Sequence, residues 1–271
     1  MKTVLMTGAA GGIATWLRPR LVERYGSLRV SDIKTPENLD SRETFVAADL
    51  ANLAEVEAAC DGIDGIVHLG GHSIEGPWDT ILNANIIGTY NLFEAARRKG
   101  VKRVIFASSN HAVGYYPREL RIPPDVVPRP DSRYGVSKVF GEGLGAMYAY
   151  KHGLGVMSLR IGNVNDQPVD ARRLAIWISP DDIAQLCAIG LETPELIYEV
   201  VYATSDNDRS WYENARAYAL GYRPKSQSED YAKVVLASEE PAGDPVAEYY
   251  QGGTFCADEY TADFDKIRAK D

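Results

Sequence analysis

The stretch TVLMTGAAGGIA, residues 3–14, places a glycine-rich turn directly after a short apolar run. The apolar run predicts a buried strand, and the periodic apolar residues after the turn predict a helix ending near Tyr25. Gly8 suits the tight turn, Gly11 lets backbone approach a pyrophosphate, and Ala14 is small enough for close helix packing. Phosphate groups bind at such helix N-termini, although a purely structural turn has the same spacing. The residues predicted to bind a cofactor here are Gly8, Gly11, Gly12 and Ile13.

The same alternation of strand and helix continues through the first 162 residues. Further short apolar runs are SLRVSD, TFVAADL, GIVHLGG, RVIFASS and GVMSLRIG, beginning at residues 27, 44, 65, 103 and 155. Helical patterns lie between them, at residues 53–60, 78–99 and 134–152. Nearly continuous apolar strands that alternate with helices are typical of a parallel sheet covered on both faces. The sequence therefore predicts an α/β fold with a doubly wound, Rossmann-type parallel sheet.

The composition disfavours several classes of partner. The chain has 271 residues with 29 basic and 38 acidic side chains, a net charge of −9, which disfavours binding to nucleic acid or to an anionic membrane. No segment approaches the roughly 18 uninterrupted apolar residues of a membrane span. Three widely spaced cysteines argue against a disulfide framework and favour a cytoplasmic protein.

Acidic residues and glycines follow the next strands where a dinucleotide would lie. Asp32 ends the second strand about 20 residues after the glycine turn, where a carboxylate accepts hydrogen bonds from a ribose 2′-hydroxyl. Because that carboxylate would repel a 2′-phosphate, the sequence predicts NAD rather than NADP. Asp49 is placed to meet an adenine amino group, and the alternative for each aspartate alone is a turn or cap. The cofactor-binding residues predicted at these strand ends are Asp32, Ile33, Asp49, Leu50, Leu69, Gly70 and Gly71.

A tyrosine and a lysine share one face of the helix predicted over residues 134–152. Tyr134 and Lys138 are four residues apart, so the ammonium is expected near the phenol. A neighbouring cation favours the phenolate and lowers the pKa of the phenol, which would let Tyr134 take a proton from an alcohol. Ser109 follows the fifth strand and would hydrogen-bond the reacting oxygen. The alternatives are a surface aromatic–cation pair and a serine that only shapes a turn.

Many segments together resemble the extended short-chain dehydrogenase/reductase superfamily. They are TGAAGGIA, Asp49-Leu50, NIIGTYNLFEAA (residues 85–96), FASSNHAVGYYP (106–117) and YGVSK (134–138). A narrower set is similar to the uronate dehydrogenase family: HLGGHS (68–73), SSNHAVGYYP (108–117), RPDSRYGVSK (129–138), LRIGN (159–163), WISPDD (177–182), LGYRPK (220–225) and QGGTF (251–255). These segments occur in order over almost the whole chain.

The resemblance implies NAD-dependent oxidation of D-galacturonate or D-glucuronate at the anomeric carbon, which gives an aldaric acid lactone. It implies that Tyr134 is the general base and that Lys138 also binds the nicotinamide ribose, with Val164 at the cofactor too. The planar guanidinium of an arginine matches a carboxylate, so Arg172 is expected to bind the carboxylate of the substrate. The alternative is that Arg172 is a solvated arginine in a loop. Asn163 stands where the family has a small hydroxyl residue. The substrate-binding residues implied are Ser73, Ser109, Asn110, His111, Asn163 and Arg172.

The alternation of strand and helix changes after Gly162. Ser179, with Pro180 next to it, is typical of a helix start, and residues 199–204 and 211–220 predict a strand and a helix. The chain from residue 224 onward is expected to be polar and loop-rich.

We expect residues 1–162 to form the NAD-binding core with the Tyr–Lys pair. Residues 163–271 are expected to form a small substrate lobe and the remaining sheet and helix elements, not an independent domain. A uronic acid is the expected partner, and the protein is expected to be a homo-oligomer.

The sequence disfavours two rival functions and a metal site. A nucleotide-sugar epimerase or dehydratase shares every motif up to Lys138, but the short chain after Gly162 leaves little room to enclose a nucleotide diphosphate. A protein that senses NAD without chemistry belongs to a different class, and the Tyr–Lys pair argues against it. His68 and His72 are four residues apart at a strand end rather than on a helix, so no metal is predicted.

Overall fold

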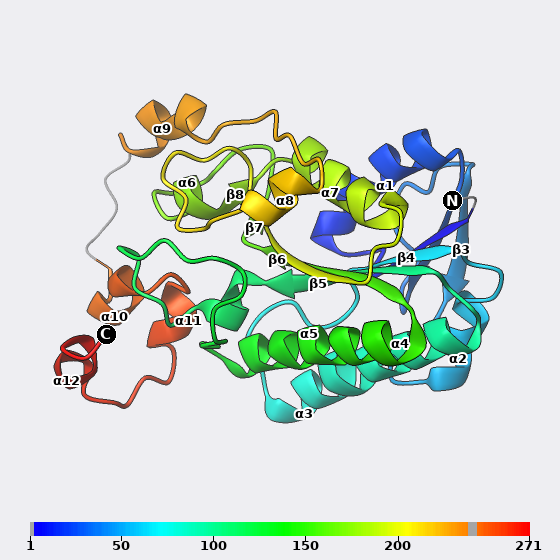
Figure 1. The fold of residues 1–271 in the computed structure, drawn as a ribbon, viewed down its shortest axis with the longest axis horizontal. Coiled ribbons are helices and arrows are strands. Elements are labelled where there is room, and N and C mark those ends of the chain that lie inside the picture. The colour runs from blue at the N-terminus through cyan, green and yellow to red at the C-terminus, as the bar shows by residue number, and fades with distance from the viewer. Residues whose placement is uncertain (1–2, 238–242) are drawn as a thin grey trace.

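A seven-stranded sheet forms the centre of the protein (Figure 1). The computed structural model describes residues 3–237 and 243–271. The strand order is β3-β2-β1-β4-β5-β6-β9, and every neighbouring pair is parallel. The doubly wound α/β fold predicted from the sequence is therefore confirmed. The strands are β1 (Val4–Thr7), β2 (Leu28–Asp32), β3 (Glu43–Ala47), β4 (Gly65–His68), β5 (Arg103–Ser109), β6 (Gly155–Ile161) and β9 (Tyr198–Ala203).

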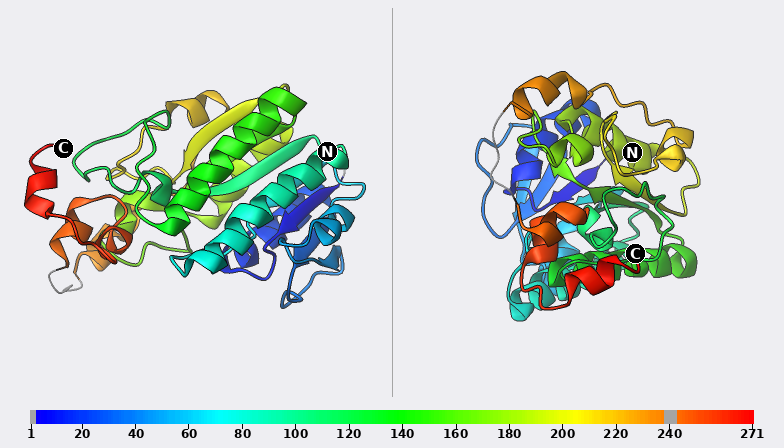
Figure 2. Two further views of the ribbon diagram at one scale, coloured as in Figure 1. Left: turned by 90° about the horizontal axis from the view of Figure 1, so that it is seen from below. Right: turned by 90° about the vertical axis from the view of Figure 1, so that its left-hand side faces the viewer.

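Helices cover both faces of the sheet. On one face, α1 (Gly12–Tyr25) and α7 (Pro180–Glu192) share a buried apolar cluster that includes Leu17 and Ile183. On the other face, α2 (Leu53–Ala59), α4 (Gly88–Arg98) and α5 (Arg133–His152) pack on a second cluster. Figure 2 (left) shows α4 and α5 side by side across this face. The two apolar layers explain why most of the central strands carry nearly continuous runs of apolar residues.

The helix predicted over residues 78–99 is divided into three parts. It consists of α3 (Trp78–Ile81), a π-helical segment (Leu82–Ile87) and α4, which ends one residue earlier than predicted. The wider turn contains the buried Asn85, whose side chain accepts from the backbone nitrogen of His72 at 2.7 Å and donates to Ser137 Oγ at 3.0 Å. Asn85 thereby joins the loop after β4 to α5. Single π turns of this kind are common at functional sites.

The capped helix start predicted at Ser179 is confirmed. The Ser179 side chain accepts from the backbone nitrogen of Asp182, and Pro180 begins α7. The segment before it contains two short strands and a helical turn. These are β7 (Asn163–Val164), which pairs with β8 (Trp177–Ile178), and α6 (Arg173–Ile176).

The helix predicted over residues 211–220 is wrong at its start. In the structure α8 spans only Ala215–Ala219. Ile122 donates to Trp211 O at 2.8 Å and accepts from the backbone nitrogen of Glu213 at 3.0 Å. Because these backbone groups pair with a distant segment, they are not available for helical hydrogen bonds.

The chain from residue 224 onward, predicted to be loop-rich, also contains short helices that the sequence did not indicate. Short helices form there, and several of them gather at one end of the molecule, at the left of Figure 1. An aromatic cluster that includes Tyr115, Tyr250 and Phe264 packs them together. These helices are stabilised by aromatic contacts between segments, and they are too short to show the long amphipathic pattern by which a helix is predicted from sequence. The helices are α9 (Glu229–Val235), α10 (Pro245–Tyr249), α11 (Thr254–Ala257) and α12 (Phe264–Arg268).

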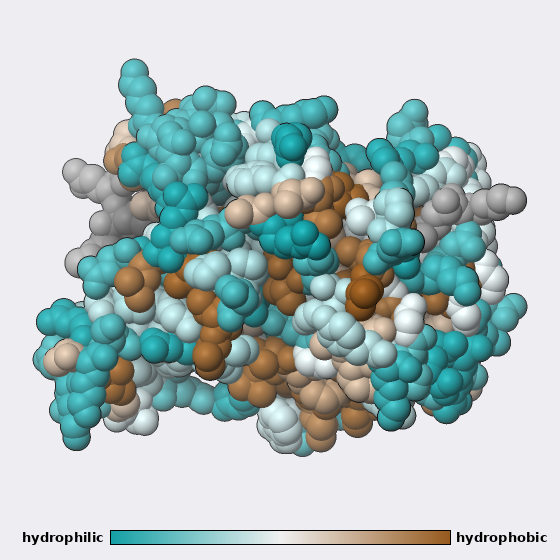
Figure 3. Space-filling model, in the orientation of Figure 1, coloured by the Kyte–Doolittle hydropathy of each residue, from teal (hydrophilic) through white to brown (hydrophobic). Residues whose placement is uncertain are grey.

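The surface is largely hydrophilic, with a group of apolar side chains at the lower centre of Figure 3. Val136, Phe140 and Met147 of α5 are among the exposed apolar residues. Within the described residues, no helix is both long enough and apolar enough to cross a bilayer.

A buried ion pair joins α5 to β6. Arg160 donates to both carboxylate oxygens of Glu142 at 2.9 Å, and the two side chains are 3% and 7% exposed. Ser108 also donates to Glu142, at 2.6 Å. The pair therefore holds the end of β5 against the helix.

Replacing Arg160→Met should lower the free energy of unfolding by about 3–5 kcal/mol, because it leaves a buried carboxylate without its cation. Urea denaturation of wild type and variant measures the loss. The matched control is Arg209→Ala, which removes an exposed pair with Glu229 and should cost less than about 1 kcal/mol. Equal losses in the two variants would contradict a structural role for the buried pair.

Candidate active site

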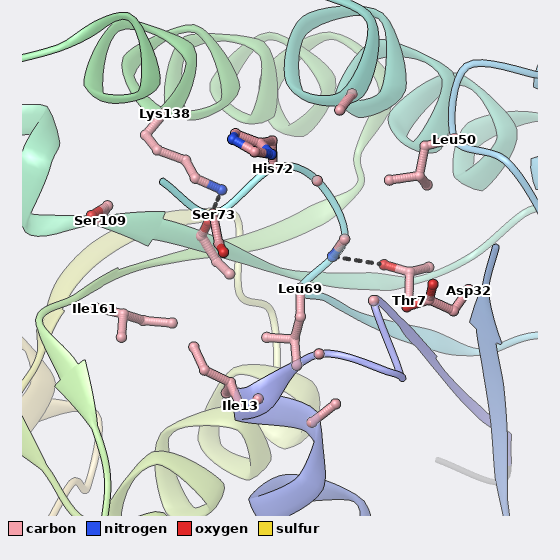
Figure 4. Close-up of a pocket in the computed structure, with 18 of the residues that line it drawn as sticks. Thr7, Ile13, Asp32, Leu50, Leu69, His72, Ser73, Ser109, Lys138 and Ile161 are labelled. Atoms are coloured by element: carbon pink, nitrogen blue, oxygen red, sulfur yellow. Dashed lines mark hydrogen bonds between the residues drawn. The ribbon is translucent and has the colours of Figure 1, made fainter. Parts of the chain in front are cut away.

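A cavity of about 570 Å³ opens along the carboxyl ends of the central strands. Figure 4 shows Lys138, Ser109 and Ile161 on one side of it and Asp32 and Leu50 on the other. The cavity thus has one end with acid–base groups and another with a strand-end carboxylate. The predicted site residues that line it are Gly8, Gly11, Gly12, Ile13, Asp32, Ile33, Asp49, Leu50, Leu69, Gly70, Gly71, Ser73, Ser109, His111, Tyr134 and Lys138.

The turn between β1 and α1 leaves amide groups available for an anion. Gly8 has a φ of +68°, and a Cβ there would lie 2.6 Å from the backbone nitrogen of Gly70, so only glycine fits. Gly11 is the N-cap of α1 and provides no side-chain cap. A Cβ at Gly12 would meet nothing within 4 Å, so this turn faces open space. The uncapped helix N-terminus at the cavity fits a pyrophosphate.

The carboxylate of Asp32 lies beside this turn. One of its oxygens accepts from the backbone nitrogen of Ala10 at 3.0 Å and the other from that of Lys34 at 3.3 Å. Asp49 lies at the next strand end and accepts from the backbone nitrogen of Ala51 at 2.9 Å. These bonds fix both carboxylates at the wall of the cavity, where Asp32 is placed to accept from ribose hydroxyls. The donor and acceptor set of this end fits NAD.

The pKa values of Tyr134 and Lys138 are determined mainly by burial and not by attraction between the two side chains. Lys138 Nζ lies 5.3 Å from the centroid of the Tyr134 ring and donates to Ala107 O at 2.8 Å. Desolvation lowers the pKa of Lys138 to about 8. Desolvation also raises the pKa of Tyr134 to about 12, which a hydrogen bond with Ser109 partly opposes. The Tyr–Lys spacing predicts a lowered phenol pKa, whereas burial raises the pKa of Tyr134 in the protein without cofactor.

Ser109 and His111 complete the acid–base end of the cavity. Ser109 closes β5, and its hydroxyl accepts from the backbone nitrogen of His111 at 3.2 Å. His111 lies in the 3₁₀ segment that follows, with Nδ1 2.7 Å from Asp131 Oδ2. Phe255, from the C-terminal lobe, stacks on the His111 ring with centroids 4.0 Å apart. The helical turn α11, which contains Phe255, thus packs near the carboxyl end of β5.

Four predicted residues lie outside the lining of this cavity: Val164, Asn110, Asn163 and Arg172. Val164 packs on the apolar core, and Asn163 Oδ1 is buried without a partner among the described residues. Arg172 donates through Nε and Nη2 to Gln251 O at 3.0 and 2.8 Å. With its amide turned to suit its neighbours, Asn110 accepts from Arg172 Nη2 at 3.1 Å. Arg172 therefore contacts Asn110, the residue that precedes His111 in the chain.

Several lining residues were missed by sequence reasoning. Thr7, Ser31 and Ser108 lie on strands just before predicted positions. Their place at the carboxyl ends of predicted strands is the signal that could have identified them. Thr80 and Ala84 come from α3 and the π-helical segment and reach the cavity only through the fold. The lining residues not predicted to bind are Thr7, Ala14, Ser31, Ala48, His72, Thr80, Ala84, Ala107, Ser108, Ile161 and Gly162.

The two histidines near β4 have separate surroundings. His68 is buried beside Thr7, with Nδ1 2.7 Å from the Thr7 hydroxyl, and burial lowers its pKa to about 3. His72 lines the cavity. Across residues 3–237 and 243–271, no group of three or more His, Cys, Asp or Glu side chains is placed to hold a metal ion.

Comparison with known proteins identifies relatives along the whole chain. Residues 4–168 match the model of the NAD dependent epimerase/dehydratase family. A uronate dehydrogenase from Pseudomonas putida is 43% identical over 93% of this chain and 94% of its own. An NAD-dependent glucose-6-phosphate dehydrogenase from Haloferax volcanii is 38% identical over 84% of this chain and 95% of its own.

Solved structures agree with these matches. The crystal structure of uronate dehydrogenase from Agrobacterium tumefaciens superposes with a TM-score of 0.91, at 43% identity, over 95% of this chain and 97% of that one. A mutant of that enzyme in complex with NAD gives the same score at 42% identity and the same coverage. The resemblance seen in the sequence and the prediction of NAD are both confirmed. The chain belongs to the NAD dependent epimerase/dehydratase family, in the group that contains the uronate dehydrogenases.

Proposed function

We propose that the protein is a dehydrogenase that oxidises D-galacturonate or D-glucuronate at C1 to the aldaric acid lactone, with NAD as cofactor. The observation that carries the proposal is a single cavity in which a dinucleotide turn meets Tyr134, Ser109 and Lys138. The similarity to uronate dehydrogenases over nearly the whole chain supports the choice of substrate.

Each end of the cavity has its own task in this mechanism. The turn at Gly11 would hold the pyrophosphate of NAD, Asp32 would hold the adenosine ribose, and Lys138 would hold the nicotinamide ribose. NAD, when bound, accepts the hydride that leaves C1 of the sugar. Tyr134 takes the proton of the C1 hydroxyl on its phenol oxygen, and Ser109 hydrogen-bonds the same hydroxyl to hold it in place.

Lys138 makes this proton transfer easier near neutral pH. Its ammonium persists below about pH 8, because its folded pKa is about 8. A cation near the Tyr134 ring stabilises the phenolate against the burial that raises the pKa of the phenol. The two groups therefore work as a pair, with the lysine stabilising the charge that the tyrosine gains as it loses its own proton.

The substrate is held by residues beyond the acid–base pair. We propose that Ser73, Asn110, His111 and Asn163 bind sugar hydroxyls and that Arg172 binds the carboxylate. Arg172 Nη1 makes no hydrogen bond within the described residues, so one edge of the guanidinium remains for a ligand. Residues 163–271 supply Arg172 and Phe255 to this region and serve as the substrate lobe of the NAD-binding core formed by residues 1–162.

Assembly and compartment are part of the same proposal. Val136, Phe140 and Met147 expose apolar surface on α5, which favours a homo-oligomer formed through this helix (Figure 3). All three cysteines are buried free thiols, which suits the reducing cytoplasm.

The wild-type protein should release NADH steadily with free galacturonate or glucuronate and none with a nucleotide sugar, as followed by the absorbance of the reduced nicotinamide. Tyr134→Phe should lower kcat by about 10²–10⁴-fold, since it removes the proton acceptor. Calorimetry should detect unchanged NAD binding in this variant. Tyr116→Phe, whose hydroxyl bonds Val127 O away from the cavity, is the control and should leave kcat unchanged. Wild-type rates in Tyr134→Phe would refute the proton role.

Without cofactor, Lys138 should titrate with a midpoint close to pH 8, because burial removes the water that stabilises its ammonium. The charged form should predominate below that pH and the neutral amine above it. A ¹³C NMR titration of the lysine Cε resonances measures the midpoint, and Lys138→Arg assigns the signal by deleting it. A midpoint near the ordinary value of 10.5 would show that the ammonium is not desolvated.

Arg172→Ala should raise KM for galacturonate by about 10–100-fold, the loss expected for a hydrogen bond to a charged group. The KM for a neutral hexose such as galactose should change far less, because galactose has no carboxylate. Steady-state kinetics with both sugars makes the comparison. Arg173→Ala, which removes a neighbouring arginine paired with Asp170, is the control. A similar rise for both sugars in Arg172→Ala would count against carboxylate binding.

A further inference from the structure

His111 has a buried carboxylate partner that no sequence motif indicated. Its Nδ1 lies 2.7 Å from Asp131 Oδ2, and the Asp131 side chain is fully buried while that of His111 is 14% exposed. Asp131 precedes Ser132, the N-cap of α5, and its backbone nitrogen donates to His111 O at 3.3 Å. The two residues are therefore linked through both side chain and backbone.

Space for this carboxylate exists only because two glycines surround it. A Cβ at Gly114 would lie 1.8 Å from Asp131 Oδ2, and a Cβ at Gly252 would lie 2.0 Å from the same atom. Gly114 follows the 3₁₀ segment, whereas Gly252 belongs to the C-terminal lobe. Two segments that are distant in the sequence thus both have a glycine at this point, and the Asp131 carboxylate occupies the space that a side chain would fill.

The surroundings of Asp131 make it a hydrogen-bond acceptor. Ser132 Oγ accepts from the backbone nitrogen of Gly135 and donates its own proton to Asp131 Oδ1 at 2.7 Å. A buried carboxylate needs such donors to offset its lost hydration. Among the described residues, His111 is its only partner within ion-pair distance, and Arg172 attracts it from farther away. In the part of the chain that the structure describes, the other oxygen, Oδ2, has besides His111 only a long contact from Cys256 Sγ at 3.9 Å, so its short contact with His111 Nδ1 requires a proton on that nitrogen.

A proton on Nδ1 decides what His111 presents to the cavity. In a neutral imidazole one nitrogen donates and the other accepts, so Nε2 is left as an acceptor. Nε2 has no hydrogen-bond partner within residues 3–237 and 243–271 and is not sealed from solvent. Phe255 stacks on the ring at an interplanar angle of 17° and restricts its tilt. The ring is thus held in both plane and direction.

We propose that Asp131 is a positioning residue that keeps His111 in the Nδ1–H form, so that Nε2 accepts a hydrogen bond from a ring hydroxyl of the sugar. The sugar contact rests on the proposed function. The tautomer itself does not, so the two can be tested apart.

The first experiment uses the wild-type protein without ligand. The chain has four histidines, so ¹⁵N NMR of the labelled imidazole rings is simple, and His111→Gln assigns the His111 signals by deleting them. A protonated Nδ1 with an unprotonated Nε2 is the expected result. A ring that carries a proton on Nε2, alone or together with one on Nδ1, would overturn the proposal, because Nε2 could then not accept a hydrogen bond. This measurement remains valid even if galacturonate proves not to be a substrate.

The second experiment is a double-mutant cycle on kcat/KM for galacturonate. Asp131→Asn should lower kcat/KM about tenfold or more in the wild-type background, the effect expected when a hydrogen bond to a charged group is lost. In the His111→Gln background the same change should cost no more than about twofold, since its effect passes through the imidazole. NAD affinity should be unchanged in both backgrounds.

A purely structural role gives a different pattern. If Asp131 only supports the N-terminus of α5, Asp131→Asn should lower kcat/KM by the same factor in both backgrounds. It should also weaken NAD binding. That result would overturn the proposal. Asp182→Asn is the matched control, because Asp182 is also fully buried and accepts from Ser205 Oγ at 2.6 Å, within the segment that caps α7. It should lower stability without changing the His111 tautomer. A His111 ring that changes tautomer in this control would overturn a specific role for Asp131.

Discussion

The proposed active site depends on close packing of α5 against the carboxyl end of β5. Gly141 makes this packing possible, because a Cβ there would lie 2.2 Å from Phe106 Cζ. Lys138 then reaches Ala107 O, and Glu142, one turn further along, accepts from Ser108. The helix that carries Tyr134 is thereby held along β5, the strand that ends in Ser109. A shift of either element would separate Tyr134, the proposed base, from Ser109, the serine proposed to position the sugar.

Burial changes the pKa values of both members of the Tyr–Lys pair, and it makes the phenolate form of Tyr134 harder to reach. The same desolvation that lowers the pKa of Lys138 to about 8 raises that of Tyr134 to about 12. An isolated phenol in this position would be a poor base at neutral pH, so the nearby ammonium is needed to stabilise its charged form. Asp131 shows the same principle, because a carboxylate without water requires donors and thereby imposes a proton on its histidine partner.

Most of the fold could be predicted because its signals are local. Strand, turn and helix follow one another within short windows, and the periodicity of apolar residues in those windows reports which face is buried. The helix predicted to begin at Trp211 was wrong because that segment pairs with Ile122. The short helices after residue 224 were missed because aromatic contacts between segments stabilise them. In both cases the deciding contact comes from elsewhere in the chain, where a sequence window carries no signal.

The sequence by itself determined which chemical groups the site contains, because the glycine turn, the carboxylates at strand ends and the Tyr–Lys spacing are properties of neighbouring residues. Only the tertiary structure decided how those groups behave. It placed the Arg172 guanidinium against Gln251 O and Asn110, and it packed two glycines around the carboxylate of Asp131. It also set the pKa values of Tyr134 and Lys138, because desolvation depends on atoms that distant segments bring together.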